Sequence, residues 1–244
     1  QLGACLGHLN AESRGAVVAA AADLLDSTSV SAIAAGFPPG FLRARENPGA
    51  RLLSAGGICE DAMGGIVAGL SAHGAHLGVA SSYAAFVAPL EHIAARVHAI
   101  GEWARRRAHG TAVNPFVIVM GHAGLKTGED GPTHADSQAL QIFAGNFPRG
   151  LCVTVVPWEP SEVWPLISAA LAARPAVVAA FVTRPEEIVP DRAALGLPPA
   201  AAAAAGAFRA RVADASAPGY GGAVVVMGSG AACETDTKAL PALE

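Results

Sequence analysis

The sequence predicts an α/β fold: a three-layer domain in which helices flank a mainly parallel sheet, followed by the start of a second α/β domain. Apolar segments of strand length alternate with longer segments of helical character, as in folds built from strand–helix–strand units. Several strand-like segments are rich in Val and almost continuously hydrophobic, which is typical of strands covered on both faces. With 244 residues, of which 52% are hydrophobic and 15% charged, the chain can bury a large core.

Strands and helices are expected to alternate along the first three quarters of the chain. The strands are expected at residues 16–22, 52–55, 76–80, 116–120, 151–156 and 176–183. The chain is expected to begin in a helix, and further helices are expected at 61–73, 84–107, 137–143 and 160–173. Pro160, Ser161 and Glu162 form a typical helix start at the last of these.

Residues 1–184 are expected to form this domain, and the composition changes after it. From 185 to 221 Pro, Ala and Gly predominate, and the alanine run 200–205 is typical of a partly helical interdomain linker. Residues 222–244 begin with the apolar segment 223–227 and a glycine-rich turn, as at the first strand of another α/β unit. The chain is therefore expected to be a fragment, a processed chain or one half of a split enzyme.

The charge and the cysteines indicate a cytoplasmic protein that binds no nucleic acid. The net charge is -4 and the pI is near 6.1, and the arginines at 105–107 are interpreted as the solvated end of a helix. The cysteines are far apart and form no Cys-x-x-Cys pair, so reduced thiols are expected rather than a zinc site or a disulfide framework. They are Cys5, Cys59, Cys152 and Cys233.

One long uncharged segment requires a decision between a membrane span and a protein core. Residues 62–90 contain no Asp, Glu, Lys or Arg. His73, His76 and Pro89 would leave polar groups unpaired in lipid, so a buried helix and strand are expected. Residues 1–10 lack the basic and apolar regions of a signal peptide. No membrane association is therefore expected.

The first candidate site residue is Glu60, in a segment that turns from strand into helix. Asp61 follows it, and glycines flank the turn. Turns of this kind lie at the carboxyl edge of a parallel sheet, where ligands bind. The alternative is that Glu60 and Asp61 simply favour the positive N-terminus of the helix.

Two later segments carry further candidate residues. Tyr83 and Phe86 follow two serines at the end of the next strand, although core packing alone would explain both rings. After residue 120, His122 and the run Gly128-Glu129-Asp130-Gly131-Pro132-Thr133-His134 bring imidazoles, carboxylates and glycines into one loop. Packing does not explain that composition. The spacing matches no compact pair of metal ligands, so polar substrate recognition is favoured and no metal site is expected.

Over residues 1–184 the sequence resembles the pyrimidine-binding domain of the thiamine-diphosphate-dependent transketolase family, in a truncated or split form. The matching residues, in order, are Gly57-x-x-Glu60-x-x-Met63, Gly69, His73-Gly74, the serine–serine–aromatic turn ending at Phe86, and Gly128 to His134. The last run is the most specific. Deoxyxylulose-phosphate synthases share a similar loop. In addition, His122-Ala123-Gly124 departs from the His-Asp-Ser that is usual in transketolases. The resemblance therefore determines the substrate less well than the cofactor.

The resemblance implies roles toward the cofactor. Glu60 matches the glutamate that hydrogen-bonds N1′ of the aminopyrimidine, which favours the imino tautomer that removes the thiazolium C2 proton. Phe86 matches the aromatic residue that stacks on the pyrimidine, and Tyr83 would form a second wall. Asp23 resembles the aspartate at the end of the first strand, close to the cofactor and the dimer contact.

The resemblance also implies roles toward sugar-phosphate substrates. His122 and Arg184 resemble groups that hold the phosphate, with Ser27 as a third donor. Asp130 would accept a hydrogen bond from the C2 hydroxyl of the aldose, and His134 would contact hydroxyls of the ketose donor. For Arg184, a surface salt bridge is the alternative interpretation.

The predicted function is transfer of a two-carbon ketol unit between sugar phosphates. The sequence contains no Gly-Asp-Gly turn of the kind that binds the diphosphate through Mg²⁺. A diphosphate-binding domain or subunit is therefore expected as a partner, in a homodimer or heterotetramer, and the chain is expected to be inactive alone. The alternatives are a thiamine-dependent acyl or ketol transferase of specialised metabolism, a deoxyxylulose-phosphate-synthase-like enzyme, and a non-catalytic partner subunit.

Overall fold

The computed structural model describes most of the chain. The described residues are 1–110, 113–123, 128–134, 139–183, 185–210, 212, 214–222, 225, 227–228, 230 and 232–239, without the side chains of 128–130.

The described residues form a six-stranded parallel sheet in the order β2-β1-β3-β4-β6-β5. The strands are β1 Val17–Ala21, β2 Leu52–Leu53, β3 Leu77–Tyr83, β4 Phe116–Gly121, β5 Cys152–Val155 and β6 Val177–Phe181. The parallel sheet is confirmed. β3 extends to Tyr83, beyond the predicted end at 80, because its serines pair with β4 as the apolar residues before them do.

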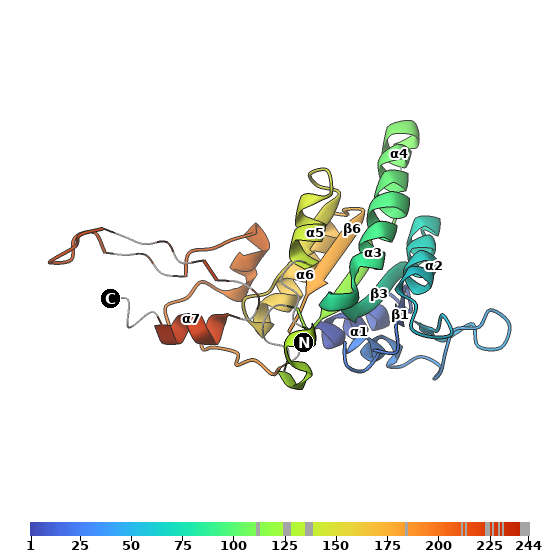
Figure 1. Ribbon diagram of the computed structural model, residues 1–244, viewed down its shortest axis with the longest axis horizontal. Coiled ribbons are helices and arrows are strands. Elements are labelled where there is room, and N and C mark those ends of the chain that lie inside the picture. Colours follow the sequence, from blue (N-terminus) through green and yellow to red (C-terminus); the bar gives the residue numbers. More distant parts are fainter. Residues whose placement is uncertain are drawn as a thin grey trace.

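Helices cover both faces of the sheet (Figure 1). One layer contains α1 Leu2–Glu12, η1 Val30–Ala34 and α6 Val163–Ala172, packed against one set of alternating strand residues. The other contains α2 Glu60–His73, α3 Ala88–Ile93 and α5 Ala139–Gly145, packed against the alternate set. Successive side chains of a strand point to opposite faces, so each strand supplies both cores.

The helix predicted at 84–107 forms as four consecutive elements. They are the 3-10 turn η2 Ala84–Phe86, α3, the π-helical turn η3 Ala94–Ala99 and α4 Ile100–His109. Buried His98 in the π turn contacts the carbonyl oxygen of Asn114 through Nε2 at 3.2 Å. Glu102 accepts from the backbone N–H of Val113 at 2.8 Å. These two contacts tie the helix to the start of β4.

Helix α2 lies unusually close to β3. A Cβ at Gly78 would lie 1.9 Å from the carbonyl oxygen of Val67, so only glycine fits beneath the helix. Buried Ser71 accepts from the N–H of Gly78 at 2.8 Å and donates to the carbonyl of Pro115 at 2.9 Å. The helix is thereby held in one position on the sheet, and so is its first residue, Glu60.

The first part of the predicted linker, up to about residue 208, packs on the domain. Arg192 donates to Glu159 at 2.8 Å and also to Glu162, and both carboxylates are almost fully buried. The alanine run forms η6 Ala200–Ala205, which contacts α6. These contacts anchor the segment beyond β6 to the end of the sheet near β5.

Beyond this segment the structure describes α7 Cys233–Ala239, in which Asp236 accepts from the indole N–H of Trp158 at 2.8 Å. Of the strand predicted at 223–227 it describes only Val225 and Met227, which are exposed and lie in no strand, so a second α/β unit stays a prediction. No helix in the described ranges is long and apolar enough to cross a membrane.

Candidate functional site

The strand order identifies one edge of the sheet as the place for a ligand. β2 and β3 lie on opposite sides of β1, so the connections leaving β1 and β2 run in opposite directions. In open α/β sheets, ligands bind outside the carboxyl ends of the strands at such a switch point. Tyr83 ends β3 and His122 follows β4 at this same edge.

Glu60 is the first residue of α2 and is half-buried. Its Oε1 accepts a hydrogen bond from the Oγ of Ser82 at 3.0 Å, and Ser82 is fully buried in β3. The carboxylate therefore lies at the carboxyl edge of the sheet, bonded to the residue that directly precedes Tyr83. It also lies at the positive end of the α2 dipole.

Four of the predicted site residues form one aromatic cluster. Tyr83 stacks on His122, with 3.7 Å between the ring centroids, and lies 6.3 Å from Phe86 at an interplanar angle of 27°. His134 stands edge-on to Tyr83 at 5.6 Å and to Phe86 at 5.5 Å. Phe86 remains 45% exposed, so the cluster keeps an aromatic ring available to a ligand.

His122 is held in an unusual backbone conformation beneath Tyr83. Its φ is 54°, in the left-handed region that a non-glycine residue seldom adopts. The side chain is fully buried, and Tyr83 is itself 8% exposed. Such conformations concentrate at functional sites, where the surrounding structure compensates their cost. In this conformation the imidazole of His122 lies inside the protein rather than on the surface of the site.

The loop after β1 reaches the same edge. Asp23 also has a left-handed φ, 61°, and its side chain is exposed, as is that of Ser27. Buried Thr28 donates to the carbonyl of Leu24 at 2.6 Å. A Cβ added at Gly121 would lie 3.2 Å from Thr28 and 3.6 Å from Tyr83, so this loop packs directly beside the aromatic cluster.

Two predicted substrate residues cannot be placed. Arg184 and the side chain of Asp130 lie outside the described part of the chain. Among the described residues, no three His, Cys, Asp or Glu side chains are grouped to hold a metal ion. Ser82 and Thr28 were not among the predicted site residues, although Ser82 is part of the matched serine–serine–aromatic turn.

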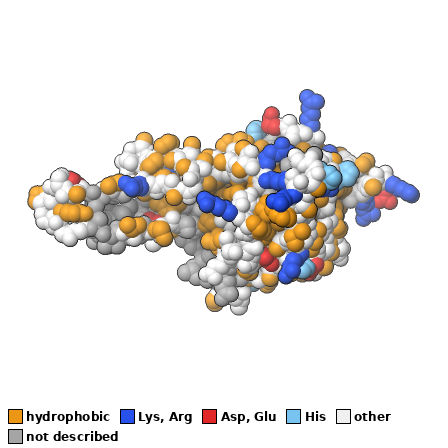
Figure 2. Space-filling model, turned by 90° about the horizontal axis from the view of Figure 1, so that it is seen from above, with side chains coloured by type: hydrophobic (Ala, Val, Ile, Leu, Met, Phe, Trp, Pro, Cys, Tyr) orange, Lys and Arg blue, Asp and Glu red, His pale blue; other side chains and the backbone are white. Residues whose placement is uncertain are grey.

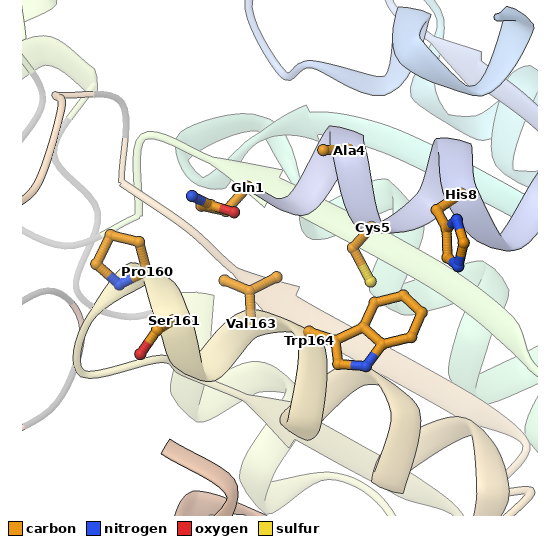
Figure 3. Close-up of a pocket in the computed structure, with 8 residues that line it drawn as sticks. All are labelled: Gln1, Ala4, Cys5, His8, Pro160, Ser161, Val163 and Trp164. Carbon is orange, nitrogen blue, oxygen red and sulfur yellow. The ribbon is translucent and has the colours of Figure 1, made fainter. Parts of the chain in front are cut away.

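A separate hollow of about 370 Å³ lies between α1 and α6, on the face of the sheet opposite α2 (Figure 3). Cys5 and His8 of α1 face Val163 and Trp164 of α6 across it, and His8 packs edge-on against Trp164 at 5.3 Å. Burial raises the pKa of the Cys5 thiol to about 11, so this thiol is unreactive at neutral pH. None of the predicted site residues lines the hollow.

The fold and the strand order together define an α/β domain with a candidate ligand site at a switch point of its parallel sheet. Residues 3–186 match the family model described as "Transketolase, pyrimidine binding domain". This chain therefore belongs to the transketolase pyrimidine-binding domain family. A search of curated proteins found no match.

Solved transketolase structures share this fold. Transketolase from Leishmania mexicana is similar with a TM-score of 0.62 at 20% identity, over 78% of this chain and 25% of that one. A protein titled "Split gene transketolase, inactive beta4 tetramer" gives 0.54 at 23%, over 78% and 53%. Transketolase from Campylobacter jejuni gives 0.53 at 20%, over 78% and 27%. The chain thus spans a quarter to a half of the length of these proteins.

Proposed function

We propose that this chain supplies the pyrimidine-binding half of a thiamine-diphosphate enzyme that transfers a two-carbon ketol unit between sugar phosphates. The observation that carries the proposal is the half-buried carboxylate of Glu60, anchored by Ser82 at the same sheet edge as the exposed ring of Phe86. Thiamine diphosphate, when bound, supplies the carbanion chemistry that carries the two-carbon unit.

These side chains fit the aminopyrimidine of the cofactor. A heteroaromatic ring presents a flat face and a polar edge, and Phe86 offers an exposed ring while Glu60 offers an acceptor. In the proposal, Glu60 holds a hydrogen bond to N1′, and Phe86 and Tyr83 flank the ring. Asp23 lies on the adjoining loop, near the cofactor and the contact with a second chain. The described residues contain no metal cluster, so Mg²⁺ is assigned to a partner domain.

The substrate assignments follow the same edge of the sheet. His134 is half-buried in the aromatic cluster and is assigned to the hydroxyls of the ketose donor. Ser27 is exposed on the β1 loop and is assigned to the phosphate together with Arg184. Asp130 is assigned to the C2 hydroxyl of the aldose. The imidazole of His122 is fully buried, so contact with a phosphate requires that the side chains covering it move.

An apolar helical face supports the need for a partner. Four hydrophobic side chains on α2, η3 and α4 are between 44% and 57% exposed. They are Ile66, Val97, Ile100 and Trp103. Figure 2 shows hydrophobic side chains across the visible face of the molecule, with separate Lys and Arg side chains among them. Large exposed apolar areas mark interaction sites. A diphosphate-binding domain or subunit would cover this surface, in a homodimer or a heterotetramer.

The proposal includes a cytoplasmic location, supported by four cysteines that are free thiols in the described structure.

The second candidate function is an acyl or ketol transferase that uses the same cofactor with another acceptor, as in specialised metabolism or deoxyxylulose-phosphate synthases. The buried imidazole of His122 favours an acceptor without a phosphate, as in specialised metabolism, because it leaves one phosphate ligand fewer at the surface. A non-catalytic partner subunit is the alternative from another class.

The proposal is tested by ketol transfer. The chain is mixed with a diphosphate-binding partner, thiamine diphosphate and Mg²⁺, and transfer from xylulose 5-phosphate to ribose 5-phosphate is measured. We expect activity only in the mixture, reduced by about 100-fold or more in Glu60→Ala, the scale of losing a catalytic acid–base group. Asp61→Ala, the exposed neighbour in the same helical turn, is the matched control. Full activity of Glu60→Ala would refute the mechanism.

A further inference from the structure

We infer that Ser82 is a positioning residue for Glu60, holding one carboxylate oxygen so that the other is directed to the cofactor. The inference rests on the proposed function of Glu60. Ser82 Oγ donates to Glu60 Oε1 at 3.0 Å, from the end of β3 to the start of α2, 22 residues earlier in the chain.

The sheet geometry places the Ser82 hydroxyl beneath α2. Ala80 belongs to the hydrophobic core on the α2 side of the sheet, and Val79 belongs to the core on the α1 side. Side chains alternate along a strand, so Ser82 shares the face of Ala80. Its backbone is fixed by pairing with Met120 of β4. The donor therefore stands on an interior strand of the sheet, under the first turn of the helix.

The hydroxyl is buried, whereas the carboxylate is only half-buried. Glutamate has three rotatable side-chain bonds, and ordering such a side chain costs conformational entropy. A hydrogen bond from a buried donor to a charged oxygen is stronger than one between neutral groups. Ser82 thus orders the carboxylate before the cofactor arrives, which is the preorganisation that a binding site needs.

The adjacent Ser81 provides a matched control. It is equally buried in β3, but its hydroxyl donates to the carbonyl of Val119 at 3.2 Å, on the other face of the sheet. Ser81→Ala removes the same atom from the same strand without touching Glu60. Ser82→Thr keeps the hydroxyl, and a β-branched residue suits a strand.

The first readout needs no cofactor. The order of the Glu60 side chain is measured by ¹³C NMR relaxation in the free chain and its variants. We expect the order to fall in Ser82→Ala and to match the unmodified protein in Ser81→Ala and Ser82→Thr. Unchanged order in Ser82→Ala would overturn the inference, whatever the activity of the chain.

The second readout uses the complex with its diphosphate-binding partner, thiamine diphosphate and Mg²⁺. Deuterium exchange at C2 of the cofactor is measured beside its Kd. Ser82→Ala is expected to slow exchange about tenfold, as when a charged group loses one hydrogen bond. The Kd of the cofactor is expected to change less than about threefold. Ser82→Thr is expected to restore the exchange rate. Equal slowing in Ser81→Ala, or no rescue by threonine, would show a merely structural role and refute the inference. No accelerated exchange in the unmodified complex would instead contradict the proposed function itself.

Discussion

The ring of Tyr83 lies on the imidazole of His122, with 3.7 Å between the centroids and 16° between the planes. Tyr83 comes from the end of β3 and His122 from the residue after β4, two strands that pair directly. His122 has no exposed surface, and the ring of Tyr83 covers one face of its imidazole. We therefore expect Tyr83 to limit the access of a ligand to His122.

Replacing Tyr83 by alanine should expose His122. The expected result is fast modification of His122 by diethyl pyrocarbonate, followed by peptide mass spectrometry, against slow modification in the unmodified protein. Tyr83→Phe keeps the ring and should keep the protection. Equal protection in Tyr83→Ala would mean that other side chains, rather than the tyrosine, cover the imidazole. Circular dichroism shows that each variant is folded.

Gly78→Ala should destabilise the domain by about 2–4 kcal/mol, since the added methyl group meets the backbone oxygen of Val67 and must displace α2. The measurement is urea unfolding. Gly69→Ala is the matched control on α2, where a Cβ meets no described atom within 4 Å. The better helix propensity of alanine should raise the free energy of unfolding by up to about 1 kcal/mol. Equal stability of the two variants would contradict the close approach of α2 and β3.

Arg192→Met should lower the free energy of unfolding by about 3–5 kcal/mol, because it leaves the buried carboxylates of Glu159 and Glu162 without their cation. It should also make the segment after β6 sensitive to limited proteolysis. Arg43→Met removes an exposed pair with Glu46 and should change stability by less than about 1 kcal/mol. Protease resistance of Arg192→Met equal to that of Arg43→Met would show that the ion pairs do not anchor this segment.

His98 should make the fold sensitive to mild acid. Burial lowers its pKa, although the carbonyl of Asn114 and the charge of Glu102 act in the opposite direction. The unfolded chain then binds the proton more readily, so stability is full above a pH of about 6.5 and falls as the pH drops through that value. His98→Gln should flatten the dependence of unfolding free energy on pH between about 7.5 and 5.5, whereas exposed His109→Gln should leave it unchanged. An unaltered slope in His98→Gln would contradict this assignment.

The sheet was predictable because its strands are apolar runs whose length and alternation with helices depend on local sequence alone. Glu60, Phe86 and His134 were identified through the resemblance of their motifs to the transketolase family, and the structure brings them to one edge of the sheet. Ser82 and Thr28 were not identified, because their contacts depend on strand register and on how close α2 and the β1 loop approach the sheet. The docking of the linker depends on Arg192 meeting two glutamates 30 and 33 residues earlier, which composition cannot reveal.

Cofactor binding to separated and combined halves tests most directly whether this chain is half of an active site. Titration calorimetry with thiamine diphosphate and Mg²⁺ compares the chain alone, the diphosphate-binding partner alone, and the mixture. We predict binding at least about 100-fold tighter in the mixture than in either half, weakened about tenfold by Phe86→Ala, which removes an aromatic stacking surface. If the mixture binds the cofactor no more tightly than the partner alone, and Phe86→Ala has no effect, this chain is not half of the active site.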